Sequence, residues 1–252
     1  MTPLTISVIT VCYNSDKTLR RTLESVAQQD WPRVEHIVVD GGSADNTAEI
    51  LKEFHSQLAS VISEPDNGIY DAMNKGVLLA KGDIIGILNS DDIFSCPTVL
   101  SSVARLFQDD KVDAIFGDLQ YFRADASQKT VRTYRSKNFM PSKLSMGLMP
   151  AHPTLFLRKR VYEKYGIFNP SYKLAGDFEF ISRIFRDGEL NYLYLPEVIV
   201  RMQLGGASTA GLISNIKIFQ EKFRACKENA ISSNYLKLMS CYPQKILEYI
   251  FH

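Results

Sequence analysis

The feature that most constrains this chain is a short apolar segment that ends on two adjacent carboxylates. Residues 84–88 read IIGIL, and NSDD follows directly at residues 89–92. An apolar run of this length, bounded by Gly82 and by polar residues, predicts a strand that is buried on both faces of a parallel sheet. Because ligands of open α/β sheets bind outside the carboxyl ends of the strands, we expect Asp91 and Asp92 to lie at a ligand site.

The two aspartates have two interpretations. Adjacent carboxylates repel each other, and burying them without a partner is costly. A divalent cation that carries a phosphorylated ligand would relieve both problems, because Mg²⁺ typically uses one or two carboxylates plus substrate phosphates. The alternative is a solvated turn that caps the next helix, since aspartate is a good N-cap residue. These residues alone leave both interpretations open.

Strand and helix patterns alternate around this segment. In the first hundred residues, strand patterns at 6–13, 36–39, 61–62 and 84–88 are separated by helix patterns, the last of them at 69–80. This alternation predicts βαβ units and a parallel sheet. The later residues predict a strand pair at 114–122 and 130–134, a strand at 154–157, helices at 159–165 and 178–186, and two strands at 193–195 and 198–202 on either side of Pro196.

Composition limits the class of protein. The chain has 252 residues, of which 45% are hydrophobic and 23% charged, as expected for one α/β domain with a small appendage. A net charge of +1 provides no field that favours nucleic acid, so we expect no nucleic-acid partner. The four cysteines form no CxxC pair, which argues against a zinc site and suits a reducing cytoplasm. The first residues lack a signal-peptide pattern and no apolar run is long enough to span a bilayer, so we expect a cytoplasmic protein with at most peripheral membrane contact.

Known nucleotide-binding motifs are missing at the first strand. Residues 11–16 contain no glycine, which argues against a dinucleotide site, and the P-loop pattern is also absent. The second strand ends on Asp40, which is expected at the same edge as Asp91. A carboxylate there can accept a hydrogen bond from a base or a ribose, and Gly41 and Gly42 would allow a ligand close to the backbone. The alternative is an ordinary turn between a strand and a helix.

Six segments in register resemble known enzymes. Four of them, in the same order, resemble family 2 of the glycosyltransferases, the inverting nucleotide-sugar enzymes of the GT-A fold. A fifth resembles the helix that carries the catalytic base of that family, and a sixth resembles a segment of bacterial polysaccharide enzymes similar to those of colanic acid assembly. The segments are SVITVCYN at 7–14, VVDGGSADNT at 38–47, NGIYDAMNKG at 67–76, LNSDD at 88–92, LAGDFEFISR at 174–183 and MQLGGAST at 202–209.

The resemblance implies a donor site. It places four residues against the base and ribose: Thr10, Tyr13, Asn14 and Asp40. It places Ser90 at the donor and Asp91 on a metal, Mn²⁺ or Mg²⁺, that binds the diphosphate. Asp92 is either a second metal ligand or a helix cap. Asn89 takes the first position of the family's Asp-x-Asp motif, which is a departure, although an amide can still accept a hydrogen bond from ribose or water.

A helix that opens at residues 67–68 carries three further candidates. Asp71, Asn74 and Lys75 lie on it, and a helix N-terminus with a lysine suits a sugar or a diphosphate oxygen. The alternative is that the three residues form a solvated helix face.

The resemblance also implies an acceptor side. Asp177 would be the general base, because Gly176 stands where the family usually has a glutamate and Asp177 is then the carboxylate at that spot. Glu179 is two residues further on and points elsewhere on the helix. His152 would touch the acceptor or a phosphate, although a lone histidine is more often structural.

The implied function is inverting, metal-dependent transfer from a UDP- or GDP-sugar to a saccharide hydroxyl. The implied acceptor is linked to undecaprenyl diphosphate, in the biosynthesis of a bacterial surface polysaccharide such as an exopolysaccharide or O-antigen. A sugar nucleotidyltransferase would show a glycine-rich, basic loop after the first strand, which residues 11–16 lack. A nucleotide-binding scaffold that has lost the chemistry is favoured by Asn89 and Gly176 and opposed by Asp91 together with Asp177.

We expect a GT-A domain with a mostly parallel, Rossmann-like sheet at residues 1–210. Residues 1–110 would bind the nucleotide sugar and residues 111–210 the acceptor, and residues 211–252 would form a C-terminal helical extension. The extension is basic and places Ile216, Phe219 and Phe223 near helical spacing. Such a stripe can rest on anionic lipid at the inner face of the cytoplasmic membrane, or it can pack on its own domain.

Overall fold

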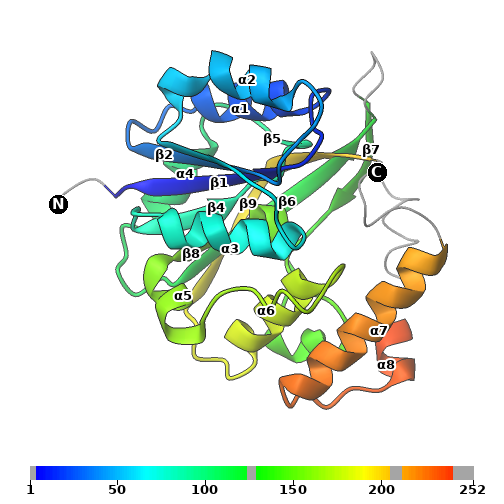
Figure 1. Cartoon of the computed structure of the whole chain (residues 1–252). Helices are drawn as coiled ribbons and strands as arrows, with labels where there is room; N and C mark the ends of the chain where they lie inside the picture. The colour runs from blue at the N-terminus through cyan, green and yellow to red at the C-terminus, as the bar shows by residue number, and fades with distance from the viewer. Residues whose placement is uncertain (1–3, 124–128, 205–211, 241–252) are drawn as a thin grey trace.

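A mixed β-sheet forms the centre of the molecule (Figure 1). The computed structural model describes residues 4–123, 129–204 and 212–240. Within them the sheet has nine strands in the order β3-β2-β1-β4-β8-β6-β9-β5, and β7 pairs with β6 off this path. The strands are β1 (Ile6–Cys12), β2 (Val34–Asp40), β3 (Ser60–Ser63), β4 (Ile84–Ile87), β5 (Asp92–Phe94), β6 (Ala114–Phe122), β7 (Thr130–Tyr134), β8 (Phe156–Arg158) and β9 (Tyr192–Gln203).

The first half of the sheet is wholly parallel, as the alternating pattern predicts. β1 pairs in parallel with β2 and β4, and β2 pairs in parallel with β3. Every residue of β1 is buried, because helices cover both faces. The α/β fold class with flanking helices is therefore confirmed. The helices of this half are α1 (Leu19–Ala27), α2 (Thr47–Glu53), α3 (Ile69–Leu79) and α4 (Val99–Leu106), with a short 3₁₀ helix, η1 (His55–Gln57).

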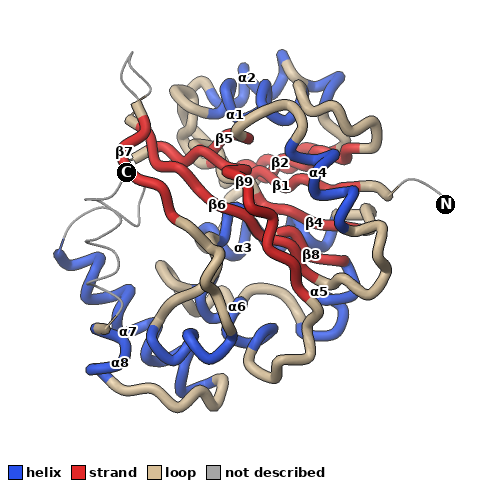
Figure 2. The backbone as a smooth tube through the Cα atoms, turned by 180° about the vertical axis from the view of Figure 1, so that it is seen from behind, coloured by secondary structure: helices blue, strands red, loops and turns tan. Residues whose placement is uncertain are grey.

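Strand alternation divides the core between the two faces. Ile9 and Ile37 point into a cluster with α3, whereas Val38 packs with α1 and α2. Seen from behind, α4 lies on the face opposite α3 (Figure 2), where Val103 joins a cluster with Val8. The carboxyl ends of β1, β2 and β4 therefore meet at one edge between these layers.

The second half of the sheet mixes directions. β8 is antiparallel to both β4 and β6, β7 is antiparallel to β6, and β9 runs parallel to β6 and antiparallel to β5. Its helical elements are η2 (Pro141–Met146), η3 (His152–Thr154), α5 (Lys159–Tyr165), α6 (Gly176–Phe185), α7 (Leu212–Glu228) and α8 (Tyr235–Met239).

One expectation about this half was wrong, and one strand was not predicted. The predicted strands on either side of Pro196 are one continuous strand, β9, which crosses the proline where its register against β6 shifts between Phe116 and Asp118. The shift leaves the proline, which has no N–H to donate, outside the ladder. Strand β5 was not expected, because its three residues carry no local pattern and depend on pairing with β9.

The C-terminal helices pack on the domain. Ala225 and Cys226 of α7 are buried in the cluster that also contains α6, whereas Ile216 stays exposed. None of the helices formed by the described residues has the length and apolar character needed to cross a membrane. Most of the resembling segment at 202–209 and the end of the expected helical extension, residues 241–252, lie outside the described residues.

Candidate active site

The two carboxylates follow β4 at the edge where the parallel strands end. Asp91 is half-buried, and Asp92 is fully buried as the first residue of β5. Asp92 donates its backbone N–H to the Asn89 carbonyl (3.0 Å), and the Asn89 amide donates to Asp92 Oδ2 (3.4 Å). The interpretation of Asp92 as a helix cap is wrong, since the next helix begins at Val99 and the residue at its N-cap position is Thr98.

Buried polar atoms without partners gather around these carboxylates. Asp92 Oδ1, Asn89 Oδ1 and Arg21 Nε have no hydrogen-bond partner among the described residues. Burial raises the pKa of Asp91, against the opposing charge of Arg21, and burial together with Asp91 raises the pKa of Asp92 well above its ordinary value. Buried carboxylates with an unsatisfied oxygen are costly, and a divalent cation would satisfy that oxygen and favour the ionised forms.

The chemistry of this donor set fits Mg²⁺ or Mn²⁺ that is shared with a ligand. Nowhere in the described part of the chain do three or more His, Cys, Asp or Glu side chains form a group that could hold a metal. A cation held by Asp91 and Asp92 would therefore complete its coordination with oxygens of a phosphorylated ligand and water, as Mg²⁺ commonly does.

An exposed aromatic ring and a carboxylate lie beside the end of β2. Tyr13 is 64% exposed, and its Cδ2 would lie 3.3 Å from a Cβ added at Gly41. The Asp66 carboxylate would collide with that same Cβ, so glycine at 41 is what allows it to lie there, and its Oδ1 accepts from the Gly68 N–H (2.8 Å). Sequence reasoning missed Asp66, because it lies just before the segment at 67–76 and belongs to none of the six resembling segments.

Two residues expected to contact the nucleoside lie inside the protein instead. Thr10 is fully buried, and its hydroxyl is 3.0 Å from His36 Nε2. Asp40 is 1% exposed, and its Oδ2 accepts from the Ser63 hydroxyl (2.6 Å) and from the Ser43 N–H (3.2 Å). The direct contacts expected of Thr10 and Asp40 are therefore corrected: the Thr10 side chain joins β1 to β2, and the Asp40 side chain holds the turn after β2.

The loop after β1 is tied to its neighbours. Asn14 is in the left-handed region (φ 48°), which asparagine tolerates better than most residues. Its Oδ1 accepts from the Ala44 N–H (2.9 Å), and its own N–H donates to the Ser43 hydroxyl (2.8 Å). Ser90 lies 2.9 Å, hydroxyl to hydroxyl, from Ser15. Asn14 and Ser90 thus lie at the expected edge and join its loops.

The three candidates on α3 divide between surface and core. Asp71 accepts from the Asn67 backbone N–H (3.0 Å) at the start of the helix. Lys75 lies 2.7 Å from Glu64, and this hydrogen bond raises the lysine pKa. Asn74 is buried, and its amide both donates to and accepts from the Phe168 backbone (2.8 Å each). The expected donor contact of Asn74 is corrected, because both ends of its amide hold the 168 segment.

Asp177 lies in the first turn of α6 and is half-buried. Ala175, and not Asp177, occupies the N-cap position of this helix. Asp177 Oδ1 accepts from the Phe178 N–H (2.8 Å) and from the Tyr70 hydroxyl (3.4 Å). A Cβ added at Gly176 would lie 2.7–2.9 Å from the Tyr70 ring, so the ring occupies the space that a side chain would need there.

His152 and Glu179 occupy different surroundings. His152 is buried and makes an edge-to-face contact with Phe168, and burial lowers its pKa while the charge of Asp177 opposes that shift. Glu179 is buried and forms two 3.0 Å bonds with Arg183. Its Oε1 also accepts from the Asn229 amide (3.3 Å). The acceptor-side role expected of Glu179 is corrected, since its carboxylate is committed to a structural ion pair.

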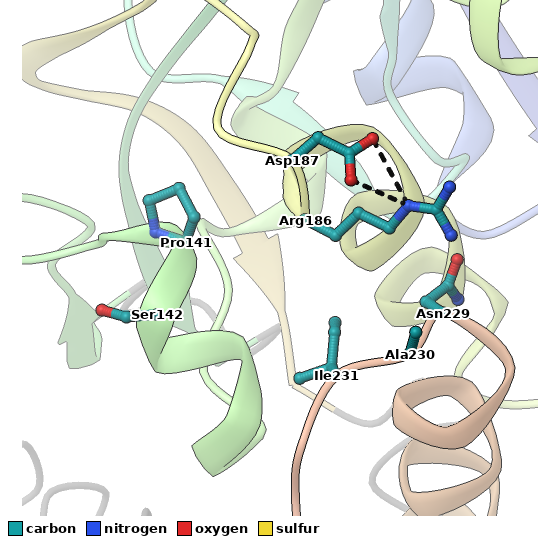
Figure 3. Close-up of a pocket in the computed structure, with 7 residues that line it drawn as sticks. All are labelled: Pro141, Ser142, Arg186, Asp187, Asn229, Ala230 and Ile231. Carbon is teal, nitrogen blue, oxygen red and sulfur yellow. Dashed lines mark hydrogen bonds and ion pairs between the residues drawn. The ribbon is translucent and has the colours of Figure 1, made fainter.

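A separate hollow of about 630 Å³ lies at the other end of α6 (Figure 3). Arg186 and Asp187, which form an ion pair of 3.3 Å, line it together with residues of η2 and the segment after α7. None of the candidate residues is in its lining. The candidate site is thus the open edge of the sheet and not this hollow.

Comparisons with known proteins agree with this geometry. A family model described as Glycosyl transferase family 2 matches residues 7–167. The uncharacterized glycosyltransferase MT1564 of Mycobacterium tuberculosis (strain CDC 1551 / Oshkosh) is 36% identical over 185 residues, which are 71% of this chain and 68% of that protein.

Two solved structures show the same fold at low identity. S. aureus TarS 1–349 in complex with UDP-GlcNAc is 18% identical with a TM-score of 0.71, and the match covers 92% of this chain and 68% of that one. The mannosyltransferase PcManGT of Pyrobaculum calidifontis, in complex with GDP-Man and Mn²⁺, is 19% identical with a TM-score of 0.67 and coverages of 92% and 65%. Against a longer TarS chain, this chain spans only 39% of the length.

Proposed function

Because the chain belongs to glycosyltransferase family 2 and is a glycosyltransferase, we propose that it transfers a sugar with inversion from a nucleoside-diphosphate donor to a saccharide hydroxyl. The observation that carries this proposal is the pair of carboxylates, Asp91 and Asp92, with an unsatisfied buried oxygen at the carboxyl edge of the sheet. The solved relatives that hold UDP-GlcNAc, or GDP-Man with Mn²⁺, support a UDP- or GDP-sugar donor and a divalent cation.

The base side is linked to the same edge. Tyr70 reaches Asp177 from α3, and the Lys173 ammonium donates to the Asn67 carbonyl (3.0 Å) just before α3 begins. Asp66, in the turn before Asn67, lies over Gly41 at the end of β2. Residues from distant parts of the chain thus connect the expected base to the expected nucleoside site.

Each residue then has a task in the proposed reaction. Asp91 and Asp92 would hold Mn²⁺ or Mg²⁺, which when bound supplies positive charge against the charge that develops on the leaving diphosphate. Asp177 accepts the proton of the acceptor hydroxyl as general base. Attack from the side opposite the diphosphate inverts the anomeric centre. One carboxylate is sufficient for this proton transfer, unlike the pair used by glycosidases.

Two residues would recognise the nucleoside. Tyr13 offers an exposed ring on which a base can stack, and the Asp66 carboxylate beside it can accept from a base N–H. Asn14 and Ser90 would act at the ribose and diphosphate, and Asp71 and Lys75 would lie next to the donor at the start of α3. His152, near enough to Asp177 to feel its charge, would face the acceptor.

The acceptor is proposed to be lipid-linked, in the biosynthesis of a bacterial surface polysaccharide. Apolar side chains are exposed on the C-terminal helices, at Ile216 (59%), Leu236 (80%) and Met239 (57%), and Lys217 and Lys237 are exposed beside them in the chain. Such a surface can rest on anionic lipid at the inner face of the cytoplasmic membrane. In this proposal the halves divide near residue 110, and α7 adds to the acceptor half.

The proposal can be tested without knowing the acceptor. The full chain is heated with a panel of UDP- and GDP-sugars, with Mn²⁺ and with EDTA, because a ligand that binds only the folded state raises the unfolding temperature. We expect one class of nucleotide sugar to raise it in Mn²⁺ and to lose that effect in EDTA. Equal effects in Mn²⁺ and EDTA would refute the metal-dependent donor site, and no effect from any nucleotide sugar would refute the donor assignment.

A further inference from the structure

We propose that Tyr70 is a positioning residue that orients the carboxylate of Asp177. Its ring fills the space that a side chain at position 176 would need. This inference rests on the proposed role of Asp177 as general base. It adds a residue on α3 that no step of the proposed reaction uses. The following contacts carry it.

The hydroxyl of Tyr70 is placed to donate to the carboxylate. The distance from Tyr70 Oη to Asp177 Oδ1 is 3.4 Å, and the side chain of Tyr70 is 6% exposed. Burial and the charge of Asp177 raise the pKa of Tyr70, so the phenol keeps its proton and remains a donor. The other bond to the same oxygen comes from the Phe178 N–H (2.8 Å), and the two donors together restrict how the carboxylate can rotate.

The ring of Tyr70 and the glycine at 176 form one arrangement. The ring atoms Cδ2, Cε2 and Cζ would all lie within 2.9 Å of a Cβ at Gly176. Real Cβ atoms do not approach a ring this closely, so any side chain at 176 has to displace the tyrosine. Position 176 is glycine here, where the family usually has a glutamate, and the Tyr70 ring fills the space that the glutamate side chain would need.

Tyr70 is itself held firmly. Its ring stacks on Phe168 (5.9 Å, 23°), and Phe168 packs on Phe180 of α6 (4.5 Å between ring centroids). Asn74, one turn further along α3, brackets the Phe168 backbone with two 2.8 Å bonds. This chain of contacts fixes the hydroxyl relative to α6, which is what an orienting role requires.

The other ionisable groups around Asp177 come from different elements. His152 of η3 and Tyr70 of α3 feel its charge. Glu221 of α7 accepts from the Ala175 N–H (2.7 Å), and Lys222 lies over the Phe178 ring (4.8 Å). Lys173 precedes the helix and is bonded to Asn67. Of these groups, within the described part of the chain, only the Tyr70 hydroxyl donates a hydrogen bond to the Asp177 carboxylate.

The test compares Tyr70→Phe with Tyr162→Phe. Tyr162 is a matched control, because it is also buried and its ring stacks on Phe180. Turnover is measured as donor hydrolysis, with water as the acceptor, at saturating nucleotide sugar. We expect Tyr70→Phe to bind the donor within about threefold of wild type and to turn over about tenfold more slowly. The loss should appear in turnover and not in donor affinity, because the hydroxyl orients the base and does not bind the donor. Tyr162→Phe should leave both turnover and donor affinity unchanged.

The variant Asp177→Asn distinguishes failure of the proposed base from failure of the role of Tyr70. If this variant turns over like wild type, the base assignment fails and the role of Tyr70 fails with it. If Asp177→Asn is slow while Tyr70→Phe matches Tyr162→Phe in turnover, the role of Tyr70 alone is refuted. Should Tyr70→Phe not fold, Gly176→Ala decides the question. Alanine keeps the phenol but displaces its ring, so we expect the same loss of turnover, and unchanged turnover would overturn the inference.

Discussion

Removing the carboxylate of Glu221 should loosen the helix that carries Asp177. Glu221 lies on α7, and its two oxygens accept from the N–H groups of Lys173 (3.0 Å), Leu174 (2.9 Å) and Ala175 (2.7 Å). The N-cap residue of α6, Ala175, has no side chain that can cap the helix. A side chain from α7 therefore supplies the cap that the local sequence lacks.

The magnitude follows from these three bonds. An N-cap side chain is worth about 1 kcal/mol, and a negative charge near a helix N-terminus adds roughly 0.3–1 kcal/mol. With three N–H groups left unpaired, of which those of Leu174 and Ala175 are partly buried, we expect Glu221→Ala to lower the free energy of unfolding by about 2–3 kcal/mol. For a chain of this size that is a fall in unfolding temperature of roughly 5–10 °C. Glu221→Gln keeps one acceptor and should lose about half as much.

Thermal unfolding by calorimetry checks this expectation, with turnover measured on the same samples. Glu163→Gln is the matched control, since Glu163 is an exposed glutamate on α5. The control should unfold within about 1 °C of wild type, as surface substitutions usually do. If Glu221→Ala unfolds there too, the reasoning about the cap is refuted.

Three other predictions concern the metal, acid stability and the membrane. Binding of a nucleoside diphosphate, measured by calorimetry, should need Mg²⁺ or Mn²⁺. Asp91→Ala should remove that dependence, and Asn89→Asp should be tolerated. Undiminished binding in excess EDTA would contradict the assignment. Burial lowers the pKa of His36 from 6.5 to about 3. Between these two pH values the unfolded chain binds a proton at His36 and the folded chain does not. Stability should therefore fall as pH falls from about 6.5 towards 3, by about 1.4 kcal/mol per pH unit. Chemical unfolding measures the free energy of unfolding at pH 7 and at pH 5. Its decrease between the two should be about 2 kcal/mol smaller in His36→Gln than in wild type, and an equal decrease in both proteins would refute this. The fraction of protein that co-sediments with anionic vesicles should fall steeply as salt is raised, and it should be lower still in Leu236→Ser and Met239→Ser. Binding that does not depend on salt would exclude the proposed contact.

Local patterns predicted the parallel half of the sheet well. Residues 6–13 are mostly apolar and residues 84–88 wholly so over the length of a strand, and the structure ends these strands within one residue of the prediction. The same holds for the helix at 159–165, which the structure reproduces in full. In these segments the periodicity of the sequence and the tertiary environment favour the same structure.

What the sequence did not predict depends on contacts between distant residues. Strand β5 exists because Asp92 pairs with Met202, which lies far along the chain. The burial of Thr10 and Asp40 depends on His36, Ser43 and Ser63, whose positions no local pattern reveals.

The same limit applies on the acceptor side. Glu179 lies two residues after Asp177 in the sequence, yet its carboxylate is held by Arg183 and Asn229. The positioning contacts of Tyr70 and Glu221 join Asp177 to α3 and α7. A motif resemblance identifies the carboxylate at 177, but only the folded chain shows what holds it.

The turnover of Asp177→Asn at saturating donor tests the central claim most directly. Asparagine keeps the shape of the side chain and can still accept from the Phe178 N–H and the Tyr70 hydroxyl, but it cannot take a proton. The account predicts intact folding, donor affinity close to wild type and a rate lower by about 10²–10⁴-fold, with the acidic limb of the pH profile lost. A rate within a few-fold of wild type would contradict it.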